Sequence, residues 1–305
     1  MHDLIIIGAG PAGLTAAIYG IRAGLSLVVI EKLSPGGQVI NTNEVENYPG
    51  FVDPIPGWEL MSAMENQARR LGAEIQSGVI NEIRKDNNSG SFHVILSEGR
   101  TLDCKSVLVA TGTNHKKLNI PGESELLGRG VSFCATCDGA FYKDKITAVI
   151  GGGNTALEDA DYLTRFASRV YLIHRRDQFR GAKILQNRVL SNNKIDPVYD
   201  TVVHSINGDN GVESLSLINK KTNESSELKV DGVFVLVGFE PNTAFLPNEI
   251  LNEKGEVIVD MQMRTPIEGL FAAGDMRENS RRQIVMAAAD GATAGLSAYE
   301  YIVSS

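Results

Sequence analysis

The sequence predicts an α/β protein with two Rossmann-like domains, because one pattern of apolar strand, glycine-rich turn and helix occurs twice, within residues 4–30 and 146–173. Both turns have the spacing of a dinucleotide site, GAGPAG in the first copy and GGGNTA in the second. The first glycine permits a tight turn, the second lets the backbone approach a pyrophosphate, and the third small residue lets the helix pack on the strand.

Composition and charge narrow the class of protein. The 305 residues are 43% hydrophobic, which suits about two domains of ordinary size. A net charge of −8 argues against a nucleic-acid or anionic membrane partner, since either needs a broad basic face. The opening residues have no basic start and only a short apolar run, so we expect no signal peptide or membrane span. Three cysteines, one unpaired, fit a reducing, cytoplasmic location.

In the first copy, a buried strand at 4–7 leads into a helix over 11–23, and a second strand at 27–30 ends in Glu31. Such domains hold a ribose hydroxyl at this position. A carboxylate there would repel a 2′-phosphate, which favours FAD or NAD over NADP. A turn that is merely rich in glycine is the alternative interpretation.

We next expect a loop at 32–57 and a helix at 58–71. These are followed by β structure at 79–102 and a buried strand at 107–110. In the long loop, Gln38 and Asn47 are candidate contacts to a ring system, with an ordinary role in a turn as the alternative. A polar segment at 113–122 is a plausible domain boundary.

Cys134 and Cys137 form a CxxC pair that Asp138 follows directly. At a helix start this spacing can close a disulfide and lower the pKa of one thiol to about 7 from about 8.5. A carboxyl beside it could supply or accept the proton of each reduction. A zinc site is the first alternative, although no second ligand pair is evident, and a structural disulfide is the other. The remaining Cys104 is expected to be a passive small residue.

The second copy differs from the first after its second strand. In place of Glu31 it has His174, Arg175 and Arg176, with Arg180 close behind. Guanidinium groups pair with a ribose 2′-phosphate, so this site is expected to bind NADPH. A solvated basic turn is the alternative.

The rest of the chain is expected to form β structure at 192–237 with a hairpin at NGDNG, a second crossing between domains at 238–243, a strand at 269–273 and a helix over 282–303. Asp275 follows that last strand and could hold a polyol hydroxyl. Small residues along the helix allow either close approach to a ligand or close helix packing.

Seven motifs together resemble the low-molecular-weight, bacterial-type thioredoxin reductases of the class II pyridine nucleotide-disulfide oxidoreductase family, over essentially the whole chain. They are, in order, GAGPAG, GGQ with EVENYPG, VATG, CATCDG, GGGNTA, HRRDQFR and FAAGD followed by RRQI. No single motif is specific, but the set is. Where many relatives carry two aromatic residues after CATCDG, this chain has Ala140 and Phe141, which affects the expected contact with the protein substrate.

The resemblance implies a homodimer with a discontinuous FAD-binding domain, residues 1–113 and 243–305. A second domain, residues 114–242, would be inserted into it, bind NADPH and carry the CxxC, and both domains would have the three-layer ββα form. Cys137 would face the flavin, Cys134 would exchange with the substrate, and Asp138 would act as acid and base. The residues implied to contact FAD are Gly8, Gly10, Pro11, Ala12, Gly13, Glu31, Gln38, Asn47, Gly112, Gly274, Asp275, Arg282, Gln283 and Ile284. The residues implied to hold NADPH are Gly151, Gly153, Asn154, Thr155, His174, Arg175, Arg176 and Arg180.

The implied reaction passes electrons from NADPH through FAD to the disulfide of Cys134 and Cys137, and then to thioredoxin or a thioredoxin-like protein. No metal is expected. Because the inserted domain carries both the cysteines and the NADPH site, and both must address one flavin, we expect it to rotate between two poses about hinges at 113–117 and 238–242.

Other functions on the same scaffold are an oxygen-reducing dithiol oxidase and a ferredoxin-fed flavin reductase, neither of which needs HRRDQFR. A ferredoxin-NADP reductase would not need CATC. A non-catalytic redox sensor could carry both glycine turns, and the reductase subunit of a peroxide system would work through a thioredoxin-like partner.

Overall fold

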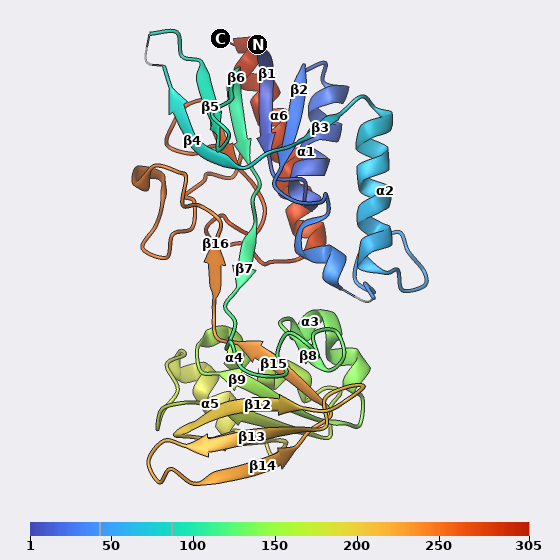
Figure 1. The fold of residues 1–305 in the computed structure, drawn as a ribbon, viewed down its shortest axis with the longest axis vertical. Coiled ribbons are helices and arrows are strands. Elements are labelled where there is room, and N and C mark those ends of the chain that lie inside the picture. Colours follow the sequence, from blue (N-terminus) through green and yellow to red (C-terminus); the bar gives the residue numbers. More distant parts are fainter. Residues whose placement is uncertain (43, 87, 305) are drawn as a thin grey trace. The chain divides into compact units, whose positions relative to one another are not determined.

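The computed structural model describes residues 1–42, 44–86 and 88–304. Asn43, in the predicted loop, and Asn87, in the predicted β region, lie outside the described residues, as does Ser305. The chain forms two compact units (Figure 1): unit 1 is Met1–Asn114 with Glu240–Ser305, and unit 2 is His115–Phe239. Unit 1 therefore combines both ends of the chain, and unit 2 is one continuous segment.

Unit 1 is built on a seven-stranded sheet in the order β3-β2-β1-β6-β5-β4, with β17 also paired to β6. Its strands are β1 His2–Ile7, β2 Leu27–Glu31, β3 Glu74–Ser77, β4 Ile80–Lys85, β5 Phe92–Leu96, β6 Thr101–Val109 and β17 Leu270–Ala272. The pairs of β1 with β2 and β6 are parallel, whereas β4, β5 and β6 pair antiparallel. Alternate residues of β1 face opposite sides, so Leu4 and Ile6 join one apolar core while Ile5 and Ile7 join another.

The helices of unit 1 are α1 Pro11–Arg22, α2 Gly57–Arg70 and α6 Ile284–Ser304, with short 3-10 turns η1 Gly37–Asn41 and η3 Asn248–Ile250. Helix α6 packs on α1 through small residues, because a side chain at Gly291 would collide with the carbonyl of Ala12. Close packing thus accounts for the small-residue face of α6. The predicted loop at 32–57 is not wholly irregular, since it contains η1.

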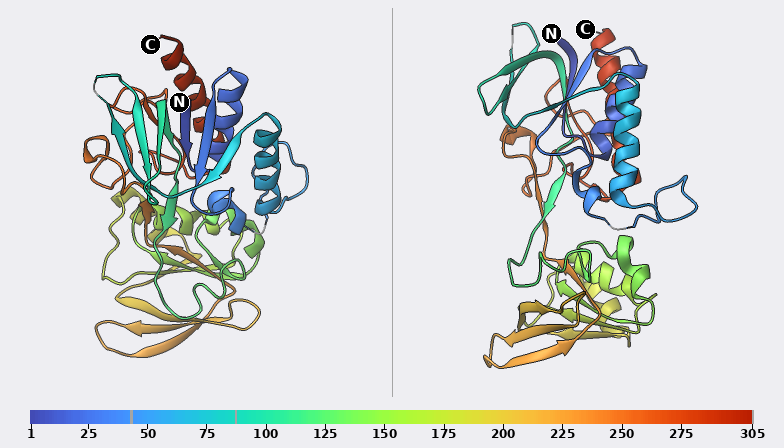
Figure 2. Two further views of the ribbon diagram at one scale, coloured as in Figure 1. Left: turned by 45° about the horizontal axis from the view of Figure 1, so that its top comes forward. Right: turned by 45° about the vertical axis from the view of Figure 1, so that its right-hand side comes forward.

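Unit 2 has three layers, as Figure 2 shows. The central parallel sheet has the order β11-β10-β9-β15-β8, and an antiparallel sheet has the order β12-β13-β14. Its strands are β8 Val131–Ser132, β9 Ile146–Gly151, β10 Arg169–Ile173, β11 Ile195–Val198, β12 Thr201–Asn207, β13 Ser214–Asn219, β14 Ser225–Lys229 and β15 Gly232–Leu236. Its helices are α3 Ala135–Asp138, α4 Asn154–Leu163 and α5 Lys183–Ser191, with the 3-10 turn η2 Gly139–Tyr142.

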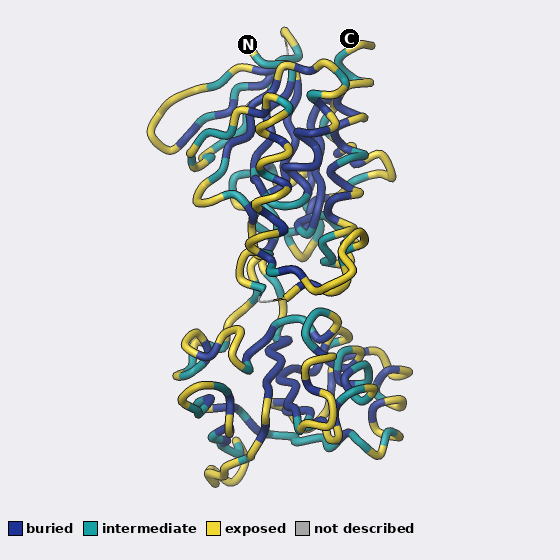
Figure 3. Tube along the Cα trace, turned by 90° about the vertical axis from the view of Figure 1, so that its right-hand side faces the viewer, coloured by how far each residue is buried: buried dark blue, intermediate teal, exposed yellow. Residues whose placement is uncertain are grey.

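The alternation of β9 explains these layers. Val149 enters the core shared with α4 and α5, whereas Ala148 and Ile150 enter the core shared with β12 and β13. Each unit has a buried interior, drawn dark blue in Figure 3, which includes the central parallel strands β1 and β2 of unit 1 and β9 and β15 of unit 2. The predicted α/β class with Rossmann-like units is confirmed.

The chain passes from unit 1 to unit 2 through β7 Thr113–His115 and returns through β16 Phe239–Pro241, and these two strands pair with each other. Within the described ranges, no helix is long and apolar enough to cross a membrane.

Candidate redox and dinucleotide sites

Cys134 and Cys137 form a disulfide, with their Cα atoms 5.3 Å apart. Cys134 is the N-cap of α3, and Cys137 lies within this short helix. Helix α3 begins just after β8, the edge strand of the parallel sheet. The Cys134 Sγ also lies 3.4 Å from the Thr136 hydroxyl. The fold therefore places one sulfur at a helix start, where N–H groups favour a thiolate.

Ser132 links Cys134 to Asp138. Its hydroxyl donates to Asp138 Oδ2 at 2.6 Å, and its Oγ accepts the N–H of Cys134 at 3.1 Å. Burial raises the pKa of Asp138, while the hydrogen bond from Ser132 acts in the opposite direction. The carboxyl beside the cysteines can therefore keep a proton closer to neutral pH than an exposed aspartate can.

Asp159 reaches the same helix from α4, where its Oδ2 accepts the N–H of Ala135 at 3.3 Å. Burial raises the pKa of Asp159 to about 6. Neither Ser132 nor Asp159 was predicted from the sequence. A serine two residues before the CxxC could have indicated a side-chain bond to the start of α3, but no local signal relates Asp159 to a residue so distant in sequence.

The first turn, residues 8–13, joins β1 to α1 in unit 1. Gly8 has a φ of +104°, which favours glycine, and a side chain at Gly13 would collide with the carbonyl of Gly8. An added Cβ at Gly10 would meet nothing within 4 Å, so this face of the turn is open. Pro11 and Ala12 then begin α1, whose start has no side-chain cap.

Carboxylates follow two strands of unit 1. Glu31 ends β2, and its Oε2 accepts the N–H of Ala9 at 2.7 Å, beside the first turn. Asp275 follows β17, and burial raises its pKa to about 6. Gly274 lies against the first turn, since an added Cβ there would be 3.1 Å from the Cβ of Ala12.

A buried ion pair holds this last loop. Asp290 of α6 pairs with Arg277 at 2.6 Å and also accepts the N–H of Gly274 at 3.2 Å. The loop and the first turn are therefore fixed against each other through α6 and α1.

The other residues of unit 1 that were implied to contact FAD occupy several places. Asn47 donates to the side chain of Gln283 at 3.1 Å, which joins the long loop to the start of α6 at Ile284. Arg282 pairs with Glu256 at 3.0 Å. Gln38 donates to Asn114 at 3.1 Å, and Gly112 follows β6.

The second turn, residues 151–156, joins β9 to α4 in unit 2. Gly151 and Gly153 form it, and Asn154 and Thr155 begin α4. The loop after β10 folds onto this turn, because the N–H of Arg180 donates to the carbonyl of Gly152 at 2.7 Å.

His174 lies against the second turn so closely that a side chain at Gly152 would collide with its ring. Burial lowers the pKa of His174, and the charges of Arg180, Arg176 and Arg175 lower it further. Within the described residues no ion pair engages these three guanidinium groups, and the buried His174 Nε2 has no hydrogen-bond partner. An anion with several oxygens would find charged hydrogen-bond donors in this cluster.

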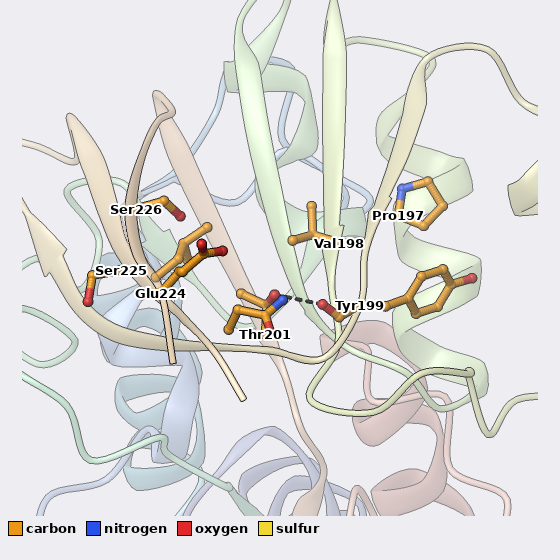
Figure 4. A pocket seen from close by; sticks show the side chains of 9 residues that line it. Pro197, Val198, Tyr199, Thr201, Glu224, Ser225 and Ser226 are labelled. Atoms are coloured by element: carbon orange, nitrogen blue, oxygen red, sulfur yellow. Dashed lines mark hydrogen bonds between the residues drawn. The ribbon is translucent and has the colours of Figure 1, made fainter. Parts of the chain in front are cut away.

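A cavity of about 620 Å³ lies elsewhere in unit 2 (Figure 4). Its lining residues are Pro197, Val198, Tyr199, Thr201, Leu217, Asn219, Glu224, Ser225 and Ser226. None of them is a predicted site residue. Over the ranges that the structure covers, no group of three or more His, Cys, Asp or Glu is placed to hold a metal ion.

A CxxC disulfide at a helix start, in a chain with two dinucleotide turns, defines the class of nucleotide-dependent disulfide oxidoreductases. The model of the pyridine nucleotide-disulphide oxidoreductase family matches residues 2–291. The chain belongs to this family and, within it, to the bacterial-type thioredoxin reductases, which confirms the predicted resemblance.

Two curated relatives and one solved structure are similar over nearly the full length. The thioredoxin reductase of Bacillus subtilis (strain 168) is 46% identical over 304 residues, covering 99% of this chain and 95% of that protein. That of Helicobacter pylori (strain J99) is 47% identical over 311 residues, covering 99% of each. The structure of thioredoxin reductase from Streptococcus pyogenes MGAS5005 has a TM-score of 0.94 at 43% identity, covering 100% of this chain and 99% of that one.

Proposed function

We propose that this protein reduces the disulfide of thioredoxin, or of a thioredoxin-like protein, with electrons from NADPH, through bound FAD and the Cys134–Cys137 pair. In the balanced reaction NADPH, one proton and an oxidised substrate give NADP⁺ and the substrate dithiol. The observation that carries the proposal is the Cys134–Cys137 disulfide at the start of α3 beside the buried Asp138. The names of the relatives support thioredoxin as the substrate.

Unit 1 has the features that FAD requires. The open face of the first turn suits a pyrophosphate, and Glu31 and Asp275 suit the hydroxyls of a ribose and a ribityl chain. When bound, this cofactor supplies a two-electron relay between nicotinamide and disulfide. The other predicted FAD contacts, Gly112, Gly274, Arg282, Gln283 and Ile284 among them, remain part of this proposal.

Unit 2 has the features that NADPH requires. The second turn would hold the pyrophosphate, and Arg175, Arg176 and Arg180 would hold the 2′-phosphate. A neutral His174, favoured by its lowered pKa, offers a ring nitrogen that can donate or accept a hydrogen bond. This assignment follows from the basic cluster beside the turn.

The two cysteines transfer electrons by thiol–disulfide exchange. The thiolate of Cys134 attacks the substrate disulfide and releases one substrate thiolate, which leaves a mixed disulfide. The thiolate of Cys137 then attacks Cys134 Sγ, which releases the second substrate thiolate and re-forms the Cys134–Cys137 disulfide. Asp138 would take the proton from the Cys137 thiol and return it to the leaving thiolate.

We further propose a cytoplasmic homodimer in which unit 2 rotates about β7 and β16 during turnover. One segment, His115–Phe239, contains both the cysteines and the basic cluster, although each must address one flavin. The cytoplasm supplies the reducing conditions in which an exchangeable dithiol works.

Anaerobic titration of the purified flavoprotein with NADPH tests the proposal. The flavin absorbance should bleach only after an additional two electrons have entered the disulfide. Cys134→Ser should keep its bound flavin and should still oxidise NADPH slowly with an artificial acceptor. It should no longer reduce thioredoxin. Cys104→Ala is the matched control, because burial raises the pKa of that thiol to about 12 and keeps it unreactive. Thioredoxin reduction by Cys134→Ser would rule out the assigned role.

A further inference from the structure

The first N–H groups of α3 are held by side chains from outside the helix. Cys134, the N-cap, makes no side-chain capping bond of its own. Its N–H donates to Ser132, and the next N–H, of Ala135, donates to the carboxylate of Asp159. Ser132 is neutral, whereas Asp159 places a carboxylate directly on an N–H of this end of the redox helix.

Packing keeps Asp159 in this position. Ala135 is fully buried in one core with Ala156 and Leu157 of α4, and at the other end of α3 a Cβ on Gly139 would be 3.2 Å from Leu163. Both ends of α3 therefore rest on α4, the helix that begins at the second turn. This packing keeps the Asp159 carboxylate within reach of the Ala135 N–H.

The charge acts on the redox pair. Exposed N–H groups at a helix start stabilise a thiolate, and a stabilised thiolate favours the reduced pair, which makes its disulfide a stronger oxidant. A carboxylate on the same N–H groups opposes this effect, since it repels the thiolate. A reductase needs a dithiol that readily gives its electrons to the substrate, so this opposition favours its task.

We propose that Asp159 is a positioning residue for the redox pair: from α4 it holds the first turn of α3, and its negative charge keeps the Cys134–Cys137 couple more reducing. This inference rests on the proposed function, because it concerns the same cysteines. It adds a second role to α4, whose start is assigned to the nucleotide.

Other charged groups lie on the two helices around Asp159. Glu158 on α4 raises the pKa of Asp159 further, after burial. Asp138 on α3 is engaged by Ser132, and Asp161 on α4 lies 3.9 Å from Arg188 of α5. With a pKa of about 6, Asp159 is charged at pH 7.5 and neutral at pH 5, so its effect should vanish on acidification.

The test is the equilibrium of the holoenzyme with dithiothreitol, without NADPH or thioredoxin. In this exchange the Cys134–Cys137 disulfide is reduced to the dithiol while dithiothreitol is oxidised to its cyclic disulfide. Acid quenching, alkylation and the mass of the peptide with both cysteines give the reduced fraction. At pH 7.5, Asp159→Asn should shift the equilibrium about three- to tenfold toward the dithiol, which corresponds to about 15 to 30 mV. At pH 5 it should match the parent protein.

Three further variants separate charge from packing. Asp159→Glu keeps the charge and should stay near the parent equilibrium, while Asp159→Ser, a second neutral variant, should shift as Asp159→Asn does. Asp161→Asn removes a charge from the same helix and should change nothing. The proposal is overturned if both neutral variants keep the parent equilibrium at pH 7.5, or if Asp159→Glu shifts as far as they do. A failure of the proposed function would appear separately, as a parent protein that does not reduce thioredoxin.

Discussion

The first and second turns share a backbone design but differ in the groups around them. Both place an extended glycine at the N-cap of a helix that lacks a side-chain cap, Gly10 in α1 and Gly153 in α4. After the second strand of each unit, however, Glu31 accepts the N–H of Ala9, whereas His174 lies against Gly152 among three arginines. The backbone of the turn is thus alike in both units, and the residues after the next strand give each turn a different charge.

The third small position of the motif also differs. Gly13 leaves no room for a side chain, because a Cβ there would collide with the carbonyl of Gly8, while the matching residue in the second turn is Ala156. The α1 helix therefore approaches its turn more closely than α4 does. The two motifs therefore differ in whether the third position accepts a side chain.

The largest effect is expected when the basic cluster loses its charge. Arg175→Gln combined with Arg176→Gln should lower kcat/KM for NADPH more than a hundredfold, because each guanidinium–phosphate bond contributes about 1.5 to 3 kcal/mol. The value for NADH should change little, and the ratio of the two in steady-state assays measures the effect. Lys220→Gln with Lys229→Gln removes the same charge elsewhere in unit 2 and serves as control. Equal losses with both nucleotides would contradict the 2′-phosphate assignment.

A smaller effect is expected from exchanging the third small residue. Gly13→Ala should weaken FAD binding about 10- to 100-fold, since overpacking typically costs about 1 to 3 kcal/mol. The reciprocal Ala156→Gly creates no collision and should leave FAD binding unchanged. Flavin content after gel filtration and fluorescence titration of flavin-free protein measure both. If Gly13→Ala and Ala156→Gly have the same FAD affinity, the closer packing at Gly13 does not contribute to FAD binding.

Removing the charge of Glu31 should have a more modest effect. Glu31→Gln should weaken FAD binding about tenfold, because a charged acceptor makes stronger hydrogen bonds to hydroxyl and N–H groups than an amide does. Glu59→Gln, an exposed residue of α2, is the control. If Glu31→Gln bound flavin as tightly as the parent protein, the Glu31 carboxylate would have no part in binding FAD.

The smallest effect concerns the stability of flavin-free protein. The pKa of Asp275 is raised to about 6, so the folded state binds this proton more tightly than the unfolded chain, and ionisation destabilises the fold as pH rises from about 4 to 6. Asp275→Asn should therefore raise the free energy of unfolding at pH 8 by on the order of 1 kcal/mol and change it little at pH 4. Urea titrations at both pH values test this, and a loss of stability at pH 8 would contradict the sign.

Strand–turn–helix units were predictable because they are encoded locally. The sequence predicts strands at 4–7 and 146–150, and the structure has β1 His2–Ile7 and β9 Ile146–Gly151. The predicted strand at 107–110, however, is the end of the longer β6, which starts at Thr101. Its first half pairs antiparallel with β5 and its second half parallel with β17, so its extent depends on partners that local periodicity does not reveal.

The sites show the same division. Glycines and arginines were identified from motifs, whereas Ser132 and Asp159 were not, because their roles depend on hydrogen bonds that exist only in the folded protein. Asp159 in particular resembles any other polar residue of a helix until α3 packs on α4. Reactive groups are therefore easier to identify from sequence patterns than the groups that position them.

The two ends of unit 2 meet, since the rings of His115 and Phe239 lie 4.9 Å apart. The cut ends of unit 1 also meet, because Asn114 donates to the side chain of Asn242 at 2.9 Å. A segment with adjoining ends can be spliced into or out of a host loop with little disturbance to either partner. Evolution could thus exchange the whole cassette, coenzyme preference and sulfur chemistry together, in a single recombination event.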